Sequence, residues 1–209
     1  MFDDPNLVSA AGLVPMLRLA RSAGLDELAQ SRLSVPTDKG ATAGGKVMAL
    51  VAGMLAGADS IDDMNVMREF RFRHVRQLDA VASRTLVNLT QSAPLLQASN
   101  DERVMVDLDD TIIEVHGYQK QGASFGYSGV RGLNALLATA STSASAPVVL
   151  GQRLRQGKTG SPKGAARIVG DALATLRRMH SASSVRPLLR AASAFVGHAP
   201  VGTAIKAGA

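Results

Sequence analysis

The chain has neither cysteine nor tryptophan among its 209 residues. Without cysteine, a disulfide framework and a thiolate metal site are both excluded. Aromatic residues make up 3% of the sequence, so base stacking can contribute little to a nucleic-acid contact. No apolar run approaches the ~20 residues of a membrane span, and the segment after Met1 lacks the basic start of a secretory signal. We therefore expect a cytoplasmic protein without a membrane partner.

Basic residues outnumber acidic ones, giving a net charge of +6 and a pI near 10.2. This balance favours a polyanionic partner, most simply nucleic acid. Residues 151–209 include ten Lys or Arg and a single acid, and five Arg lie between residues 68 and 84. The candidate phosphate contacts are Arg71, Arg73, Arg76, Lys158 and Lys163. Solvated helix faces, or a flexible exposed loop at 157–164, would account for the same charges.

The N-terminal half has the apolar spacing of helices. A helix is expected from near Val14 to Gly24, a short turn at 26–30, a buried helix over 43–57 and another helix over 74–89. Small residues in the helix over 43–57, such as Gly44, would let a neighbour approach closely. The region 1–100 is therefore predicted to be helical.

A second pattern begins at Val104, where an alternating run of β-branched and apolar residues leads directly to a cluster of acids. We read a buried strand from Val104 to Asp109 and a second strand over 112–118. Because side chains alternate along a strand, Asp107 and Asp109 would point to the same side. Two carboxylates on one face suit a divalent cation such as Mg²⁺ or Mn²⁺, and the phosphoryl chemistry that such ions serve. A solvated acidic turn at 109–111 is the alternative.

The residues that follow the acids also have an ordered pattern. Apolar strands are expected at 133–141 and 147–154, then a helix over 165–179 in which Asp171 faces outward. A further apolar run begins at Pro187. The sequence thus predicts an α+β chain, with a helical region at 1–100 and a sheet with a flanking helix at 101–209.

The Asp-Leu-Asp-Asp-Thr motif at 107–111 resembles two families. It fits the D-x-D-x-T of haloacid-dehalogenase-like phosphatases, in which Asp107 would be the nucleophile and Asp109 the general acid. It also resembles the D-x-D-[ST]-T that opens the ribonuclease-H-like core of DDE insertion-sequence transposases. The Gly-rich segment 116–137, with Lys120 and Arg131, is similar to the transposase continuation.

The transposase resemblance implies an incomplete ribonuclease-H-like mixed sheet at 101–209, and a preceding helical region that contributes to DNA binding. It implies Asp109, or else Asp107, as the catalytic and metal-binding acid, with Mg²⁺ or Mn²⁺ as the cofactor. It further implies Lys120 and Arg131 among the DNA contacts. The expected partners are the DNA ends of an insertion element, together with a second copy of the chain or an intact transposase.

Three departures from that family pattern stand out. The junction at 67–74 looks internally shortened. Segment 187–198 corresponds to the part of the family that contains the motif Arg-x-Asp-Ser-x-Phe-Tyr-Gly. Arg190 and Ser193 match the Arg and Ser of this motif, but Ala192 stands where the family has its second catalytic Asp. The chain reaches Ala209 before the third acid of the family.

An alanine offers no oxygen to a metal ion, so the resemblance implies a transposase-derived chain that is inactive by itself. Two other functions stay open from the sequence. One is a DNA-binding module without chemistry, and the other is a metal-dependent phosphatase that uses Asp107 and Asp109.

Overall fold

The computed structural model describes residues 12–35, 40–57, 74–97, 103–116, 120–179, 186–195 and 197–209. They belong to two compact units, Met1–Val81 and Ala82–Ala209, so the division falls inside helix α4 (Val75–Leu89). The division expected from the sequence lies at residue 100, after this helix. Within the described ranges the fold is α+β, as predicted. In the same part of the chain, no helix is long and apolar enough to cross a membrane.

The first unit is helical. Its helices are α1 (Leu13–Ser22), α2 (Leu25–Arg32), α3 (Ala43–Leu55) and the first part of α4. The α1–α2 junction turns at Gly24, whose φ of 74° lies in the left-handed region that glycine adopts without strain. The expected short turn at 26–30 is part of α2, which has eight residues. The apolar core of this unit consists of Leu25, Ala29, Leu33, Val35, Ala43, Val47, Met48 and Val81.

Helix α3 crosses the first turn of α2 at very short range. A Cβ atom on Gly44 would lie 2.5 Å from the carbonyl oxygen of Asp26, so a side chain there would collide with backbone. This confirms the close approach expected of the small residues at Gly44, whereas a Cβ atom on Gly57 would meet nothing within 4 Å. The helix expected to be buried over 43–57 is exposed at its C-terminal end, at Met54 and Leu55, so that part of the prediction is wrong. The buried residues of α3 lie in its first half, where α2 crosses it.

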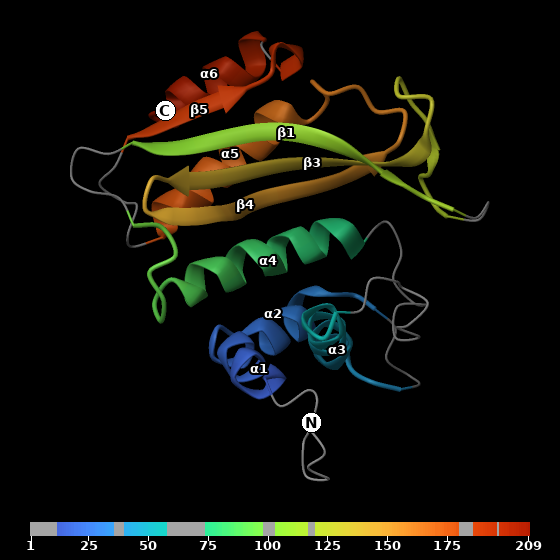
Figure 1. Ribbon diagram of the computed structural model, residues 1–209, viewed down its shortest axis with the longest axis vertical. Helices are drawn as coiled ribbons and strands as arrows, with labels where there is room; N and C mark the ends of the chain where they lie inside the picture. Colours follow the sequence, from blue (N-terminus) through green and yellow to red (C-terminus); the bar gives the residue numbers. More distant parts are fainter. Residues whose placement is uncertain are drawn as a thin grey trace, which may run out of the picture. The chain divides into compact units, whose positions relative to one another are not determined.

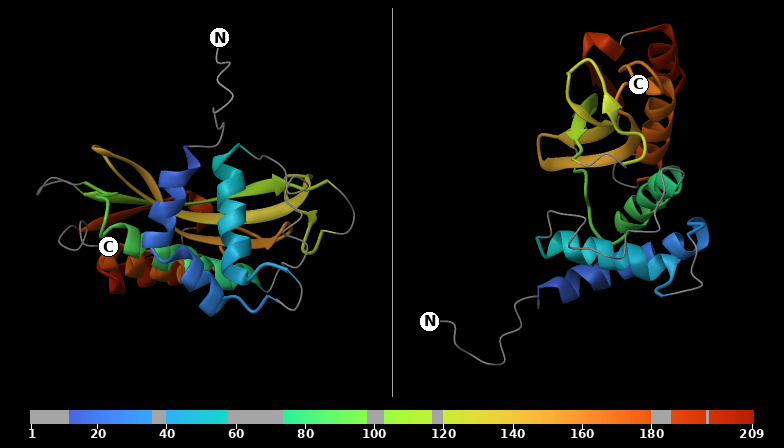
Figure 2. Two further views of the ribbon diagram at one scale, coloured as in Figure 1. Left: turned by 90° about the horizontal axis from the view of Figure 1, so that it is seen from below. Right: turned by 90° about the vertical axis from the view of Figure 1, so that its right-hand side faces the viewer.

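The second unit is built on one mixed sheet with helices against it (Figures 1 and 2). Its elements are β1 (Val104–Glu114), β2 (Ser124–Phe125), β3 (Arg131–Thr142), β4 (Ser145–Gln156), α5 (Ala165–Arg178), β5 (Pro187–Ala191), a 3₁₀ turn (Ser193–Phe195) and α6 (His198–Lys206). Strand β1 is antiparallel to β3, and β3 is antiparallel to β4. The chain then passes through α5, and β5 joins the other side of β1 in the parallel sense.

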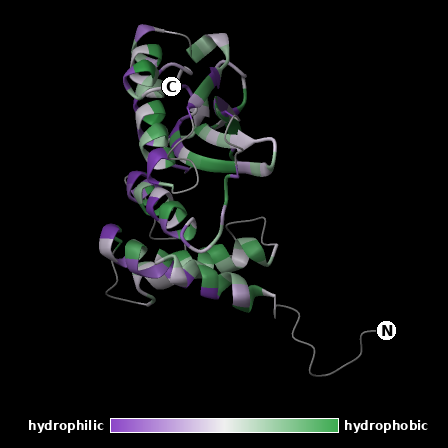
Figure 3. Cartoon of the chain, turned by 90° about the vertical axis from the view of Figure 1, so that its left-hand side faces the viewer, coloured by the Kyte–Doolittle hydropathy of each residue, from purple (hydrophilic) through white to green (hydrophobic). Residues whose placement is uncertain are grey.

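The core of the second unit lies between the sheet and α5. Alternate residues of the strands, such as Val106 on β1 and Leu136 on β3, are fully buried and meet Ile168 and Leu173 of α5. Hydrophobic and hydrophilic residues alternate along α5 in Figure 3, as a helix with one apolar face requires. The helix predicted over 165–179 and the strands predicted at 133–141 and 147–154 are thus confirmed. Each strand is a few residues longer than predicted.

One prediction for the sheet is wrong. The sequence suggested two strands separated near Asp110, but β1 is a single strand that continues to Glu114. Asp110 pairs with Leu136 and Thr111 with Ala135 in unbroken register with β3. The acids therefore do not form a turn, and alternation continues through them.

Candidate functional site

The three aspartates of β1, Asp107, Asp109 and Asp110, lie on two different faces of the sheet. Val104, Val106 and Leu108 are buried toward α5, and the strand alternation extends that face to Asp110. Asp107 and Asp109 lie on the opposite face. Continuous pairing with β3 thus separates two neighbouring carboxylates, at positions 109 and 110, into different surroundings.

Asp107 is held by an arginine from the parallel strand β5. The Nε atom of Arg190 donates to Oδ1 of Asp107 at 2.5 Å, and Nη2 donates to Oδ2 at 3.0 Å. The two residues are direct partners in the β1–β5 register. These hydrogen bonds, and the charge of Asp107, raise the pKa of Arg190. Both oxygens of Asp107 are therefore occupied by one guanidinium group.

Asp109 is exposed, and its Oδ1 accepts a hydrogen bond from the backbone amide of Asp110 at 2.8 Å. In the described part of the chain, no cationic side chain forms an ion pair with it. Strand β5 ends at Ala191, which pairs with Leu108. Ala192 is exposed and follows immediately, so one further step of the same register would bring it opposite Asp109.

Asp110 belongs to a buried polar network that also contains Arg155 and Asn134. Arg155 Nη2 lies 2.8 Å from Asp110 Oδ2, and its Nε lies 2.8 Å from Asn134 Oδ1. The amide of Asn134 donates to Asp110 at 2.6 Å, and the hydroxyl of Ser161 donates to the same carboxylate at 3.1 Å. Burial lowers the pKa of Arg155, and the neighbouring Asp110 partly offsets that effect. The pair is therefore an ion pair shielded from water.

The remaining guanidinium donor of Arg155 fixes the loop between β4 and α5. Its Nη1 donates to the carbonyl oxygens of Lys163 at 2.6 Å and Ser161 at 3.1 Å, with a longer contact of 3.4 Å to Gly160. Carbonyl groups that would otherwise need water thus have a charged donor. The loop at 157–164 is therefore tied to the sheet, which does not fit the alternative of a flexible loop.

A cavity of about 220 Å³ lies beside this network. Its lining comes from β1, from the turn before β3, from β3 itself and from the loop after β4: Asp110, Thr111, Ile112, Tyr127, Ser128, Asn134, Gly157, Lys158, Thr159, Gly160 and Ser161. We call it the hairpin pocket. It lies at one end of the sheet, and Lys158 is the cationic residue in its lining.

The predicted basic contacts fall into three groups. Lys120, Arg131, Lys158 and Lys163 belong to the hairpin, β3 and the loop after β4, at the end of the sheet that carries the hairpin pocket. Arg131 is half-buried, and its Nη1 donates to the carbonyl of Val115 at 3.3 Å. Arg76 is exposed on α4 in the first unit. Arg71 and Arg73 lie outside the described residues.

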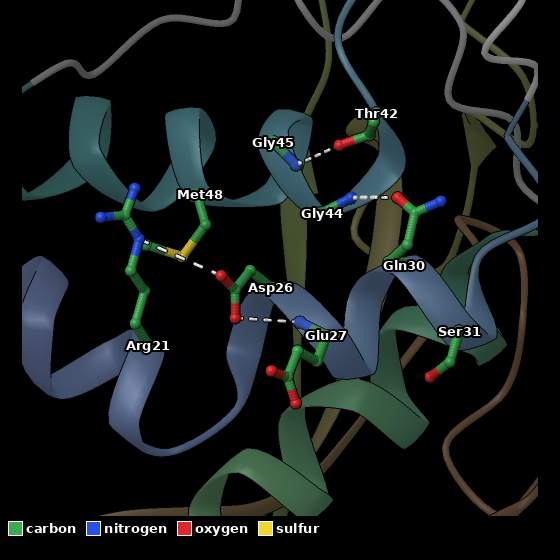
Figure 4. Close-up of a pocket in the computed structure, with 9 residues that line it drawn as sticks. All are labelled: Arg21, Asp26, Glu27, Gln30, Ser31, Thr42, Gly44, Gly45 and Met48. Atoms are coloured by element: carbon green, nitrogen blue, oxygen red, sulfur yellow. Dashed lines mark hydrogen bonds and ion pairs between the residues drawn. The ribbon is translucent and has the colours of Figure 1, made fainter.

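The first unit has a larger cavity of about 580 Å³, between α1, α2 and the start of α3 (Figure 4). Several of its polar groups already bind one another. Gln30 accepts from the amide of Gly44 at 3.2 Å, and Thr42 accepts from the amide of Gly45 at 3.2 Å. These hydrogen bonds satisfy backbone amides in the first turn of α3. The polar side chains in the cavity lining are therefore accounted for by their role in capping this helix.

Sequence reasoning missed Asp110, Asn134 and Arg155. A signal was present, because alternation continued past Asp109 puts Asp110 on the face of Val106 and Leu108. A carboxylate on such a face requires a buried cationic partner. Arg155, the second-to-last residue of β4, is the corresponding residue 45 positions later.

Comparison with protein-family models, with curated proteins and with solved structures finds no match for this chain.

Proposed function

We propose that this chain derives from a DDE-type insertion-sequence transposase and binds DNA without cleaving it. The order β4-β3-β1-β5, with three antiparallel strands and β5 parallel to β1 after a helix, supports a ribonuclease-H-like core. The observation that carries the proposal is the end of β5. Ala192 directly follows the Leu108–Ala191 pair, and the transposase resemblance calls for a second acid at this position.

The donor set at this position does not fit the two-metal chemistry of the family. Such chemistry places two Mg²⁺ or Mn²⁺ ions between several carboxylates. Here Asp107 is bound through both oxygens by Arg190, and Ala192 supplies no oxygen. Among the described residues, no group of three His, Asp or Glu side chains is close enough to hold a metal ion. Asp109 alone is available, so no cleavage step is assigned to this chain.

DNA binding is supported by the distribution of charge. The chain carries +6, and Lys120, Lys158 and Lys163 are exposed at one end of the sheet. Contacts of this type bind phosphates, and their affinity falls steeply with salt. A chain that keeps these contacts without the acids would compete with an intact transposase for DNA, or join it as an inactive subunit.

The phosphatase alternative has weaker support. A nucleophilic carboxylate needs an accessible oxygen, and ligands of open sheets bind beyond the carboxyl ends of strands. Asp107 instead lies within β1, paired with Thr139 on one side and Arg190 on the other. Its oxygens already accept two hydrogen bonds from Arg190.

The test measures DNA cleavage and DNA binding on the same samples. The unmodified chain, Ala192→Asp and Asp109→Ala are incubated with supercoiled plasmid and either Mg²⁺ or Mn²⁺, and nicking is followed on gels. Binding to a labelled duplex is followed by fluorescence anisotropy between 50 and 200 mM salt, the range over which phosphate contacts weaken most visibly. Binding of Mn²⁺ alone is measured by calorimetry.

We expect the unmodified chain to bind duplex in a salt-dependent way and not to nick plasmid. Ala192→Asp should bind Mn²⁺ more tightly, and adding Asp109→Ala should remove that gain. Nicking by the unmodified chain that is lost in Asp109→Ala would overturn the proposed inactivity. Failure to bind duplex at 50 mM salt would overturn the proposed DNA binding.

A further inference from the structure

The hairpin pocket combines a cation, hydroxyl groups and an aromatic ring. Lys158 and Thr159 come from the loop after β4, and Tyr127 comes from the hairpin before β3. Aromatic residues are scarce in this chain, yet Tyr127 has its side chain fully in water. An aromatic side chain held in water at the rim of a polar cavity offers a free π-face to a planar ligand.

The two segments that carry these groups are packed rigidly against each other. A Cβ atom on Gly126 would collide with the carbonyl oxygen of Gly157, and one on Gly157 would collide with the carbonyl of Gly132. The amide of Lys158 also donates to the hydroxyl of Ser124 at 2.9 Å. Tyr127 and Lys158 are therefore held next to each other by backbone contacts that leave no room for side chains.

The electrostatics of the pocket favour an anion of modest charge. Asp110 is neutralised by Arg155, which approaches it at 2.8 Å and is itself buried. Lys158, whose side chain is exposed, then supplies the net positive charge of the lining. The volume of about 220 Å³ is smaller than the roughly 300–1,000 Å³ of pockets that enclose drug-sized ligands. A cavity of this size is of the order needed for one nucleotide rather than for a longer segment.

We infer that the hairpin pocket binds one nucleotide of unpaired, single-stranded DNA, with the base stacked on Tyr127 and the adjacent phosphate at Lys158. An unpaired base exposes a face for stacking, whereas a base inside a duplex is already stacked on its neighbours. Thr159 is placed to donate a hydrogen bond to the same phosphate. The inference rests on the proposed DNA binding and adds a preference for strands that are locally open.

The experiment compares single-stranded and duplex DNA of one length and sequence, each labelled with fluorescein, by anisotropy with the full chain. Tyr127→Ala should weaken single-strand binding about five- to 150-fold, the range given by stacking of one base, and leave duplex binding within twofold. Tyr127→Phe should restore the affinity, because it keeps the ring. Phe125→Ala is the matched control, since Phe125 is an exposed aromatic of the same hairpin outside the pocket lining.

Lys158→Ala should weaken binding and lower the slope of log affinity against log salt by about 0.7 on the single strand. Circular dichroism of each variant shows that the fold is intact. If Tyr127→Ala binds single strands as tightly as Phe125→Ala does, the inference is refuted while the proposed duplex binding stands. If the unmodified chain binds neither form of DNA, the proposed function fails together with the inference.

Discussion

Replacing Arg155 by methionine removes the cation from a carboxylate that lies beneath the sheet. The side chains of Arg155 and Asp110 are 7% and 14% exposed, so water can hydrate little of the charge left on Asp110. Removal of one partner from a buried ion pair costs about 3–5 kcal/mol. A native domain is typically stable by about 5–15 kcal/mol, so this single change should remove a large part of the stability of the second unit.

Urea unfolding followed by far-UV circular dichroism measures the effect. With a denaturant slope near 2 kcal/mol/M, a loss of about 4 kcal/mol lowers the unfolding midpoint by about 2 M. Arg153→Met is the matched control, because Arg153 lies on the same strand and pairs with Asp171, whose side chain is 57% exposed. The Arg153 side chain itself is 18% exposed, and loss of this partly solvated pair should cost about 0.2–1 kcal/mol.

The second arm of the test replaces both members of the buried pair. Arg155→Met combined with Asp110→Leu removes the unpaired charge, so part of the lost stability should return, while Asn134 and the loop carbonyls still lack their donor. The two single changes should therefore be strongly non-additive. An Arg155→Met chain that loses less than about 1 kcal/mol, or a double variant that loses the sum of the single effects, would refute the reasoning that the pair is shielded from water.

Other substitutions should act through single, local causes. Gly157→Ala should displace the loop after β4 and lower the midpoint of thermal unfolding clearly, because the new methyl group would collide with the carbonyl oxygen of Gly132. Gly160→Ala should have little effect in the same thermal scan, because the nearest atom to its new methyl group is 4.0 Å away. Leu173→Ala should cost about 2–5 kcal/mol in urea unfolding, since the side chain is 1% exposed under the sheet and its loss leaves a cavity. Thr42→Ala should cost about 0.5–2 kcal/mol, read from helix content during unfolding, because the hydroxyl caps the first turn of α3. An effect of Thr42→Ala equal to that of Leu173→Ala would contradict this ranking.

Elements with a strong local period could be predicted from the sequence. In α5, the apolar positions Ile168, Leu173 and Leu176 recur at helical spacing, and all are buried against the sheet. In strand β3 every second residue from Gly132 to Ala140 is buried, as its alternation predicts. In each case the periodicity of the side chains and the face that is buried agree, so tertiary packing does not override the local signal.

The acidic segment could not be predicted in the same way, because its structure depends on partners far along the chain. Three polar residues at 109–111 indicate a turn by local rules. Arg155 and Asn134 supply the hydrogen bonds that let Asp110 remain in a strand, and Arg190 supplies those of Asp107, 83 residues later. Asp107 and Asp109 lie on one face, as alternation predicts, but the distant partners that keep Asp110 within the strand became visible only with the register of the sheet.

The unbroken strand β1 makes the alignment of the sheet sensitive to a single residue. A slip of β1 by one position would turn Asp107 and Asp109 inward beneath α5, and would turn Val106, Leu108 and Asp110 outward. The slipped sheet would bury two acids where Arg155 can neutralise one, and would expose part of the apolar core. Neighbouring acids of opposite orientation thus disfavour misaligned pairing during folding, independently of any ligand that the protein binds.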